Sequence, residues 1–202
     1  MPVALADRTS IRRQLRCARS ALSPGERITA AFALHDIVTH TRLFRSSKRI
    51  AYYFAFDSEI DPDPIARTAH LLGKQLFLPV IGSGKRMRFA RADASVPLSL
   101  NRFGIPEPAP GFRRYLNPRW LDLVVTPLVA FDQRGYRLGL GGGYYDACFA
   151  FLRQRDSWIK PKLLGIGYDF QRVEKIDAEQ WDVPLWCIAT DCAIYTNHEN
   201  CL

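Results

Sequence analysis

The sequence has few cysteines, and their spacing forms no metal or disulfide pattern. An odd number of five is scattered irregularly, without a C-x-x-C pair, at Cys17, Cys148, Cys187, Cys192 and Cys201. Such spacing argues against a disulfide framework and against a thiolate zinc site. We therefore expect a protein of the reducing cytoplasm.

Long apolar runs are also missing. The strongest apolar segment, residues 123–131, contains Pro127 and is far shorter than the ~20 residues that a membrane-spanning helix needs. The apolar patch before Asp7 is too short for the apolar region of a secretory signal. We expect neither export nor a membrane partner.

Motifs of several enzyme classes are absent too. There is no G-x-S-x-G nucleophile motif, and the four histidines show no H-E-x-x-H spacing. The glycines at 139–143 are not followed by the Lys-Ser/Thr of a P-loop, and Tyr144 stands where the dinucleotide fingerprint requires glycine. Neither an activated serine nor either of these nucleotide-binding loops is indicated.

The composition is that of an ordinary globular protein. With 202 residues, 48% of them apolar and 24% charged, the chain suits a single α/β domain over residues 1–202. Its net charge of +8 favours anionic partners such as phosphates, nucleic acid or polyglutamate. Charge alone does not choose among them.

Apolar periodicity predicts helices that alternate with strands. A first helix carries apolar residues at Ile11, Leu15, Ala18 and Leu22, beside a stripe of Arg8, Arg12, Arg16 and Arg19. A capping box at Ser23 starts a second helix, from Pro24 to about Arg42, which we expect to pack on the first. Further helices are predicted near 63–73 and 144–155, and strands at 49–54, 75–81, 87–92, 121–131, 162–168 and 187–195.

This order predicts a three-layer α/β/α fold, with a mostly parallel central sheet and helices on both faces. Ligands bind such sheets at the carboxyl ends of the strands. The loops at 55–61, 132–143 and 169–186 are the candidates for that edge, whereas residues 93–118 form a long connection.

The most specific segment is RLGLGGGYYD, residues 137–146. Glycines allow a close backbone approach, so the free N–H groups of a loop that opens a helix can cradle a phosphate beside a cation such as Arg137. Asp146 could then hold the Mg²⁺ that accompanies a nucleotide. A simple glycine turn is the alternative.

The longer segment AFDQRGYRLGLGGGYYD resembles the signature of the 5-formyltetrahydrofolate cyclo-ligase family. The opening helix RTSIRRQLRCARSALSPGER, then YYFAFDSEID, NRFGIPEP and WDVPL, agree with that family in order and span nearly the whole chain. The resemblance implies an enzyme that uses ATP and Mg²⁺ to convert 5-formyltetrahydrofolate, with or without a polyglutamate tail, to 5,10-methenyltetrahydrofolate, with release of ADP and phosphate. It implies no obligate protein partner.

The resemblance also implies the residues of the site. ATP would contact Arg8, Arg12, Arg137, Gly139, Leu140, Gly141, Gly142, Gly143, Tyr144 and Tyr145, with Arg137 and Tyr145 catalytic. Mg²⁺ would be held by Asp146 and Asp182, and the folate would contact Phe54, Glu59, Phe103 and Tyr145. The chain departs from the family at Arg8, usually Lys, at Trp181, commonly His, and at Trp186, often Asp.

Other interpretations stay open. The arginine stripe fits a solvated face, Glu59 a surface charge, Asp182 a turn residue, and Phe103 and Tyr145 core aromatics. At the level of function, the chain fits another nucleotide- or sugar-phosphate-binding enzyme. A nucleic-acid-binding module using the arginines and tyrosines is a further alternative, although no such motif is present and no nucleic acid partner is expected.

Overall fold

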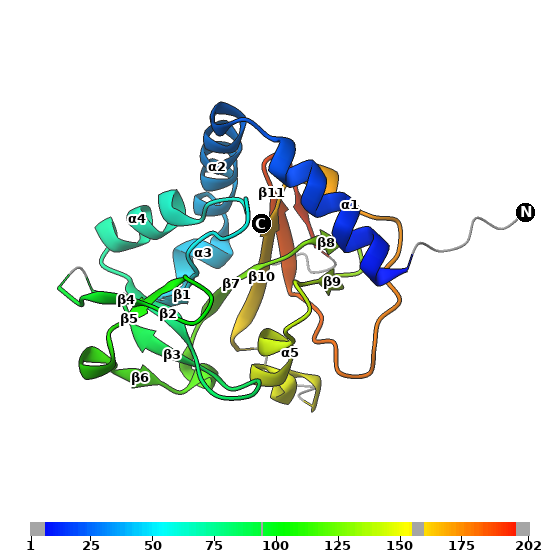
Figure 1. Ribbon diagram of the computed structural model, residues 1–202. Helices are drawn as coiled ribbons and strands as arrows, with labels where there is room; N and C mark the ends of the chain where they lie inside the picture. Colours follow the sequence, from blue (N-terminus) through cyan, green and yellow to red (C-terminus); the bar gives the residue numbers. More distant parts are fainter. Residues whose placement is uncertain (1–6, 94, 155–159, 197–202) are drawn as a thin grey trace, which may run out of the picture.

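The computed structural model of the protein describes residues 7–93, 95–154 and 160–196. An eight-stranded sheet in the order β12-β11-β10-β7-β1-β2-β3-β6 forms its centre (Figure 1). Its strands are β1 (Arg49–Ala51), β2 (Gln75–Ile81), β3 (Met87–Arg91), β6 (Tyr115–Leu116), β7 (Leu123–Pro127), β10 (Lys162–Gly167), β11 (Cys187–Thr190) and β12 (Ile194–Tyr195). The central pairings from β11 to β2 are parallel and both edges are antiparallel, which confirms the mostly parallel sheet.

Helices cover both faces of this sheet. On one face lie α2 (Pro24–Thr39), α3 (Arg42–Ser46) and α4 (Asp63–Leu71), and on the other α5 (Tyr144–Cys148) with the 3-10 turn η3 (Ala150–Gln154). Successive strand residues point to opposite layers: Leu123 and Val125 join the first core, and Val124 joins the second. The predicted three-layer α/β/α architecture is confirmed.

Local signals set the boundaries of α2. The Ser23 hydroxyl accepts a hydrogen bond from the Glu26 N–H at 3.3 Å, and the Glu26 carboxylate accepts one from the Ser23 N–H at 2.8 Å, as the capping box predicts. The helix ends at Thr39 rather than near Arg42. Thr41 explains the difference, because its hydroxyl accepts from the Phe44 N–H at 3.1 Å and so caps a new helix, α3.

Helix α1 (Arg8–Ala21) does not pack on α2 as expected. Its apolar residues Ile11 and Leu15 lie against Ala130, Leu138 and Ile176. The helix therefore lies over β8 (Ala130–Phe131) and β9 (Arg137–Leu138), on the opposite side of the molecule from α4 (Figure 1). The apolar periodicity identified Ile11 and Leu15 as packed residues but not the surface that covers them. It was wrong for Ala18, which is exposed, and it did not predict that Arg19 of the arginine stripe is buried.

The predicted strand at 121–131 is two strands. β7 ends at Pro127, and β8 pairs antiparallel with β9 in a separate small sheet. Proline lacks the N–H that would continue the ladder. Between the two strands, Leu128 and Val129 turn the chain toward the edge where the predicted ligand loops lie.

Other predicted elements are shorter than expected. The strand at 49–54 stops at Ala51, the helix at 144–155 tightens into η3 after Cys148, and the strand at 187–195 divides into β11 and β12. The connection at 93–118 carries β4 (Leu98–Leu100), β5 (Pro106–Pro108) and the turn η1 (Pro110–Phe112), and η2 (Pro118–Trp120) and η4 (Asp169–Gln171) lie elsewhere in the chain. Residue 155, His198 and Cys201 lie outside the described residues. Within the described ranges, no helix is long and apolar enough to cross a bilayer.

Candidate active site

A cleft of about 430 Å³ opens at the carboxyl ends of the parallel strands. This volume suits a small-molecule site. The predicted site residues all line it: Arg8, Arg12, Phe54, Glu59, Phe103, Arg137, Gly139, Leu140, Gly141, Gly142, Gly143, Tyr144, Tyr145, Asp146 and Asp182. A larger hollow of about 730 Å³ lies beside the segment around Asp182. Of the predicted site residues, only Asp182 lines this hollow.

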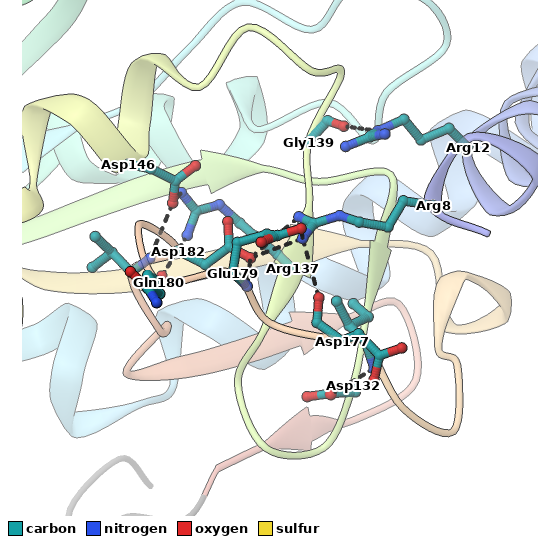
Figure 2. A network of polar contacts seen from close by, with 12 residues as sticks. Arg8, Arg12, Asp132, Arg137, Gly139, Asp146, Asp177, Glu179, Gln180 and Asp182 are labelled. Atoms are coloured by element: carbon teal, nitrogen blue, oxygen red, sulfur yellow. Dashed lines mark hydrogen bonds and ion pairs between the residues drawn. The ribbon is translucent and has the colours of Figure 1, made fainter. Parts of the chain in front are cut away.

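Two arginines of α1 reach into the cleft (Figure 2). Arg12 donates from Nε to the Gly139 carbonyl at 2.9 Å, and Arg8 donates to Asp182 Oδ2 at 3.2 Å and to the Asp177 carbonyl at 3.1 Å. Burial, and next the charge of Arg8, lower the pKa of Arg12. Two neighbouring cations held partly out of water make this wall a favourable place for an anion.

Arg137 and Asp146 form the second charged cluster. Arg137 Nη2 donates to Asp146 Oδ1 at 2.9 Å, and its Nη1 donates to the Val183 carbonyl at 2.9 Å. The N–H of Val183 donates back to Asp146 Oδ1 at 3.1 Å. Figure 2 shows Asp146 and Asp182 near each other, each paired with an arginine from a different element.

The glycine loop needs its glycines for two reasons. Gly141 and Gly143 have φ angles of +105° and +66°, which side chains rarely adopt. At Gly142 an added Cβ would lie 2.8 Å from the Tyr144 ring. The interpretation of this segment as a simple turn is therefore incomplete, because the loop also lines the cleft and opens α5.

Glu59 is not a surface charge. It is only 8% exposed, and its carboxylate accepts from the Phe56 N–H at 3.1 Å. Burial raises the pKa of Glu59 to about 7, against the opposing effects of that hydrogen bond and of Arg19. A buried carboxyl that lines a cleft is a natural acceptor for a ligand N–H donor.

Aromatic side chains line the same cleft as this carboxyl. Phe103 is 45% exposed, so it is no core residue, and its ring lies 6.4 Å edge-on from the Tyr144 ring. Tyr145 does pack on the core, with its ring centre 6.4 Å from that of Phe149, but it also lines the cleft. Burial and the charge of Glu59 raise the pKa of Tyr145, so its phenol stays protonated.

Several lining residues were not predicted as site residues. They are Tyr53, Phe56, Leu78, Pro79, Ile81, Met87, Asn101, Ile105, Pro106, Glu107, Pro127, Leu128, Val129 and Trp181, of which Trp181 was noted only as a departure from the family. Glu107 is 2% exposed and accepts from the Ile81 N–H at 2.9 Å and from Asn101 Nδ2 at 2.8 Å. It lies within NRFGIPEP, so its motif was noticed but its role in fixing the β4–β5 connection was not.

Two carboxylates of the cleft are available to a metal ion. Among the described residues, no three His, Cys, Asp or Glu side chains gather as a metal site. Asp146 and Asp182 supply two carboxylates beside the arginines. This set fits Mg²⁺, which is bound by one or two protein carboxylates together with phosphate oxygens and water.

Comparisons with known proteins agree on one family. A sequence model of the 5-formyltetrahydrofolate cyclo-ligase family matches residues 4–191. The 5-formyltetrahydrofolate cyclo-ligase of Haemophilus influenzae is 34% identical over 185 residues, 90% of this chain and 96% of that protein. The Escherichia coli K12 protein of the same name is 37% identical over 150 residues, 72% of this chain and 79% of its own.

A solved structure shows the same arrangement. The NMR structure of 5,10-methenyltetrahydrofolate synthetase from Aquifex aeolicus superposes with a TM-score of 0.79 at 29% identity. The superposition covers 94% of this chain and 92% of that one. The likeness therefore extends over nearly the whole fold.

Proposed function

The chain belongs to the 5-formyltetrahydrofolate cyclo-ligase family, and we propose that the cleft described above carries out the reaction of that family. The enzyme is an ATP-dependent ligase that converts 5-formyltetrahydrofolate to 5,10-methenyltetrahydrofolate. One observation carries the assignment to the cleft: it has two chemically different walls, one of arginines and glycine amides, the other of aromatic rings and Glu59.

We assign the nucleotide to the basic wall. Arg8, Arg12 and Arg137 suit phosphate oxygens because guanidinium groups bind them in pairs of hydrogen bonds. The loop from Gly139 to Tyr145 adds backbone N–H groups, and its four glycines allow a ligand to approach the backbone closely. Mg²⁺, when bound by Asp146 and Asp182, would supply a positive charge that neutralises phosphate oxygens.

We assign the folate to the aromatic wall. Phe54 and Phe103 offer ring faces and edges to a flat pterin, and Glu59 accepts from its amino group. Tyr145 lies where the two walls meet and can donate its phenol proton at the junction. The glutamate end of the folate would then point to the mouth of the cleft, and the net charge of +8 of the whole chain favours further glutamates.

In the proposed reaction, the formyl oxygen attacks the γ-phosphorus of ATP and the bond to the bridging oxygen breaks, which releases ADP. The neighbouring amine nitrogen then attacks the formyl carbon and loses its proton. Breakage of the carbon–oxygen bond releases phosphate and leaves the methenyl bridge. Arg137 would neutralise the phosphoryl charge while the two walls align the substrates.

The ion pairs of the cleft imply that binding of the nucleotide is coupled to binding of Mg²⁺. Arg8 and Arg137 each bind one of the two proposed metal-binding carboxylates. Phosphate oxygens would compete with these carboxylates for the arginines and so free them for a cation. We therefore expect the nucleotide and Mg²⁺ to bind together.

The test is absorbance in the near ultraviolet. Purified protein with 5-formyltetrahydrofolate, ATP and Mg²⁺ should develop the methenyl chromophore, and omission of ATP or of Mg²⁺ should each abolish it. A flat trace from folded protein that binds ATP would refute the folate assignment and redirect the search to another acceptor.

Family membership supports the folate over a sugar phosphate or a nucleic acid as the second ligand. We also propose that the enzyme acts in the cytoplasm. Among the described residues, Cys17, Cys148 and Cys192 are free thiols, a form that a reducing compartment preserves.

A further inference from the structure

Arg19 is the buried member of the arginine stripe on α1. Its side chain is 0% exposed, whereas Arg8 and Arg12 reach the cleft and Arg16 lies at the surface. A guanidinium out of water is costly unless it is paired and hydrogen-bonded. Arg19 does not line the cleft, so the proposed reaction gives it no role.

The partners of Arg19 come from two other segments. Its Nη2 donates to the Asp57 carbonyl at 2.7 Å and to Asp57 Oδ2 at 3.1 Å. Its Nη1 donates to the Leu128 carbonyl at 3.3 Å. One guanidinium therefore joins α1, the loop at 55–61 and the end of β7.

The loop that Arg19 holds is strained. Asp57 and Ser58 have φ angles of +52° and +61°, and a left-handed conformation costs a residue with a side chain about 1–2 kcal/mol. Arg16 Nε donates to Asp57 Oδ2 at 2.7 Å, and the Tyr168 hydroxyl donates to the Ser58 carbonyl at 3.4 Å. Outside contacts thus hold both residues in a conformation that the chain does not prefer.

Glu59 follows this pair directly. Its N–H donates to the Phe56 carbonyl at 3.0 Å, which closes the turn, and its carboxyl lines the cleft. Leu128, the other residue that Arg19 holds, lines the cleft as well. Of the two residues that Arg19 contacts, Asp57 therefore lies two positions before Glu59, and Leu128 is itself part of the cleft lining.

We propose that Arg19 is a positioning residue for the folate substrate: by clamping Asp57 and Leu128 it holds the left-handed turn that presents Glu59 to the pterin. This inference rests on the proposed function, because it takes the aromatic wall as the folate site. Electrostatics agree with the geometry, since the charge of Arg19 opposes the effect of burial on the pKa of Glu59.

The experiment compares Michaelis constants for the two substrates. Arg19→Met should raise the KM for 5-formyltetrahydrofolate roughly tenfold or more, while the KM for ATP stays within about twofold. Arg13→Met, an exposed position on the same helix, is the matched control and should change neither constant. Where Arg19→Met does not fold, Arg19→Lys takes its place, because it keeps the charge but cannot reach Asp57 and Leu128 together.

Glycine at position 58 separates positioning from a merely structural role. Ser58→Gly removes the strain at φ +61°, so in the Arg19 variant it should restore much of the lost folate affinity. Equal rises in both Michaelis constants, no rescue by Ser58→Gly, or an unchanged folate KM would each overturn the proposal. Absence of methenyl product from the wild-type protein would instead refute the proposed function.

Discussion

Glu59 is a carboxyl of the cleft whose ionised form is disfavoured by burial. Asp146 and Asp182 each face an arginine, whereas Glu59 is nearly buried and accepts from a backbone N–H. Its pKa of about 7, raised by burial, means that the proton is held up to neutral pH. Proton uptake by this one side chain therefore links folding stability to pH.

Glu59→Gln tests this link. A raised folded-state pKa contributes stability below the ordinary value of 4.5, and this is lost as pH rises through about 7. The variant should therefore match the wild type near pH 4.5 and exceed it at pH 8, by at most roughly 3 kcal/mol. Urea unfolding at both pH values measures the difference.

Glu174→Gln, at an exposed position, is the control for that series and should show no such pH dependence. A difference between Glu59→Gln and the wild type that is equal at both pH values would contradict the buried, protonated carboxyl.

Asp146 is a second residue whose charge can be removed without removing its shape. Asp146→Asn should lower turnover with MgATP on the order of 100-fold and raise the Mg²⁺ concentration needed for half-maximal rate. Asparagine can still accept from the Val183 N–H. Alanine would instead leave the Nη2 of Arg137, a residue only 7% exposed, without its carboxylate acceptor.

Initial rates over a Mg²⁺ titration measure this effect. Asp63→Asn breaks an exposed ion pair with Arg67 and should leave the titration unchanged. Wild-type Mg²⁺ dependence in Asp146→Asn would remove Asp146 from the proposed metal site.

At the scale of elements, the glycine loop is a segment whose backbone conformation disfavours side chains. Gly143 precedes α5 at φ +66°, and an added Cβ would meet Lys85 Nζ at 3.4 Å. Because a lysine end moves easily, the backbone conformation is the main obstacle. Gly143→Ala should cost about 1–2 kcal/mol of stability and also lower turnover, because the loop shape changes.

Thermal unfolding and the methenyl assay measure the two effects. Gly25→Ala, in α2 with open space around its Cβ and no positive φ, should be neutral or slightly stabilising. Full stability in Gly143→Ala would show that the loop adopts other conformations at no cost.

The same scale shows what the sequence can predict. β2 and the start of α2 were predicted correctly because their signals, an apolar run and a capping box, are local. The break between β7 and β8 was missed, because an apolar run does not reveal that its strand partner changes. For α1, periodicity identifies Ile11 and Leu15 as packed residues but predicts neither what covers them nor the burial of Arg19.

The site was predicted by resemblance more than by local pattern. Motif matching selected residues that the fold brings to one cleft, although their individual roles remain proposals. The clamp of Arg19 on Asp57 was beyond such reasoning, since it depends on a contact between positions 38 residues apart. Likewise, the burial of Glu59 follows from the folded loop and not from its charged neighbours in FDSEID.

Across the whole molecule, the cleft is built from distant parts of the chain. Its walls come from α1, the loop after β1, the connection at 101–107, the end of β7, the glycine loop and the segment around Asp182. The parallel central strands explain this convergence, because their carboxyl ends meet at one edge of the sheet.

The docking of α1 has a consequence for the order in which the protein folds. Arg8 binds Asp182, 174 positions away, Arg12 binds Gly139, 127 positions away, and Arg19 binds Leu128, 109 positions away. During synthesis, α1 is made before the segments that supply Leu128, Gly139 and Asp182. Its contacts with them form only after almost all of the described chain has been translated, so the docking of this helix is a late step in completing the site.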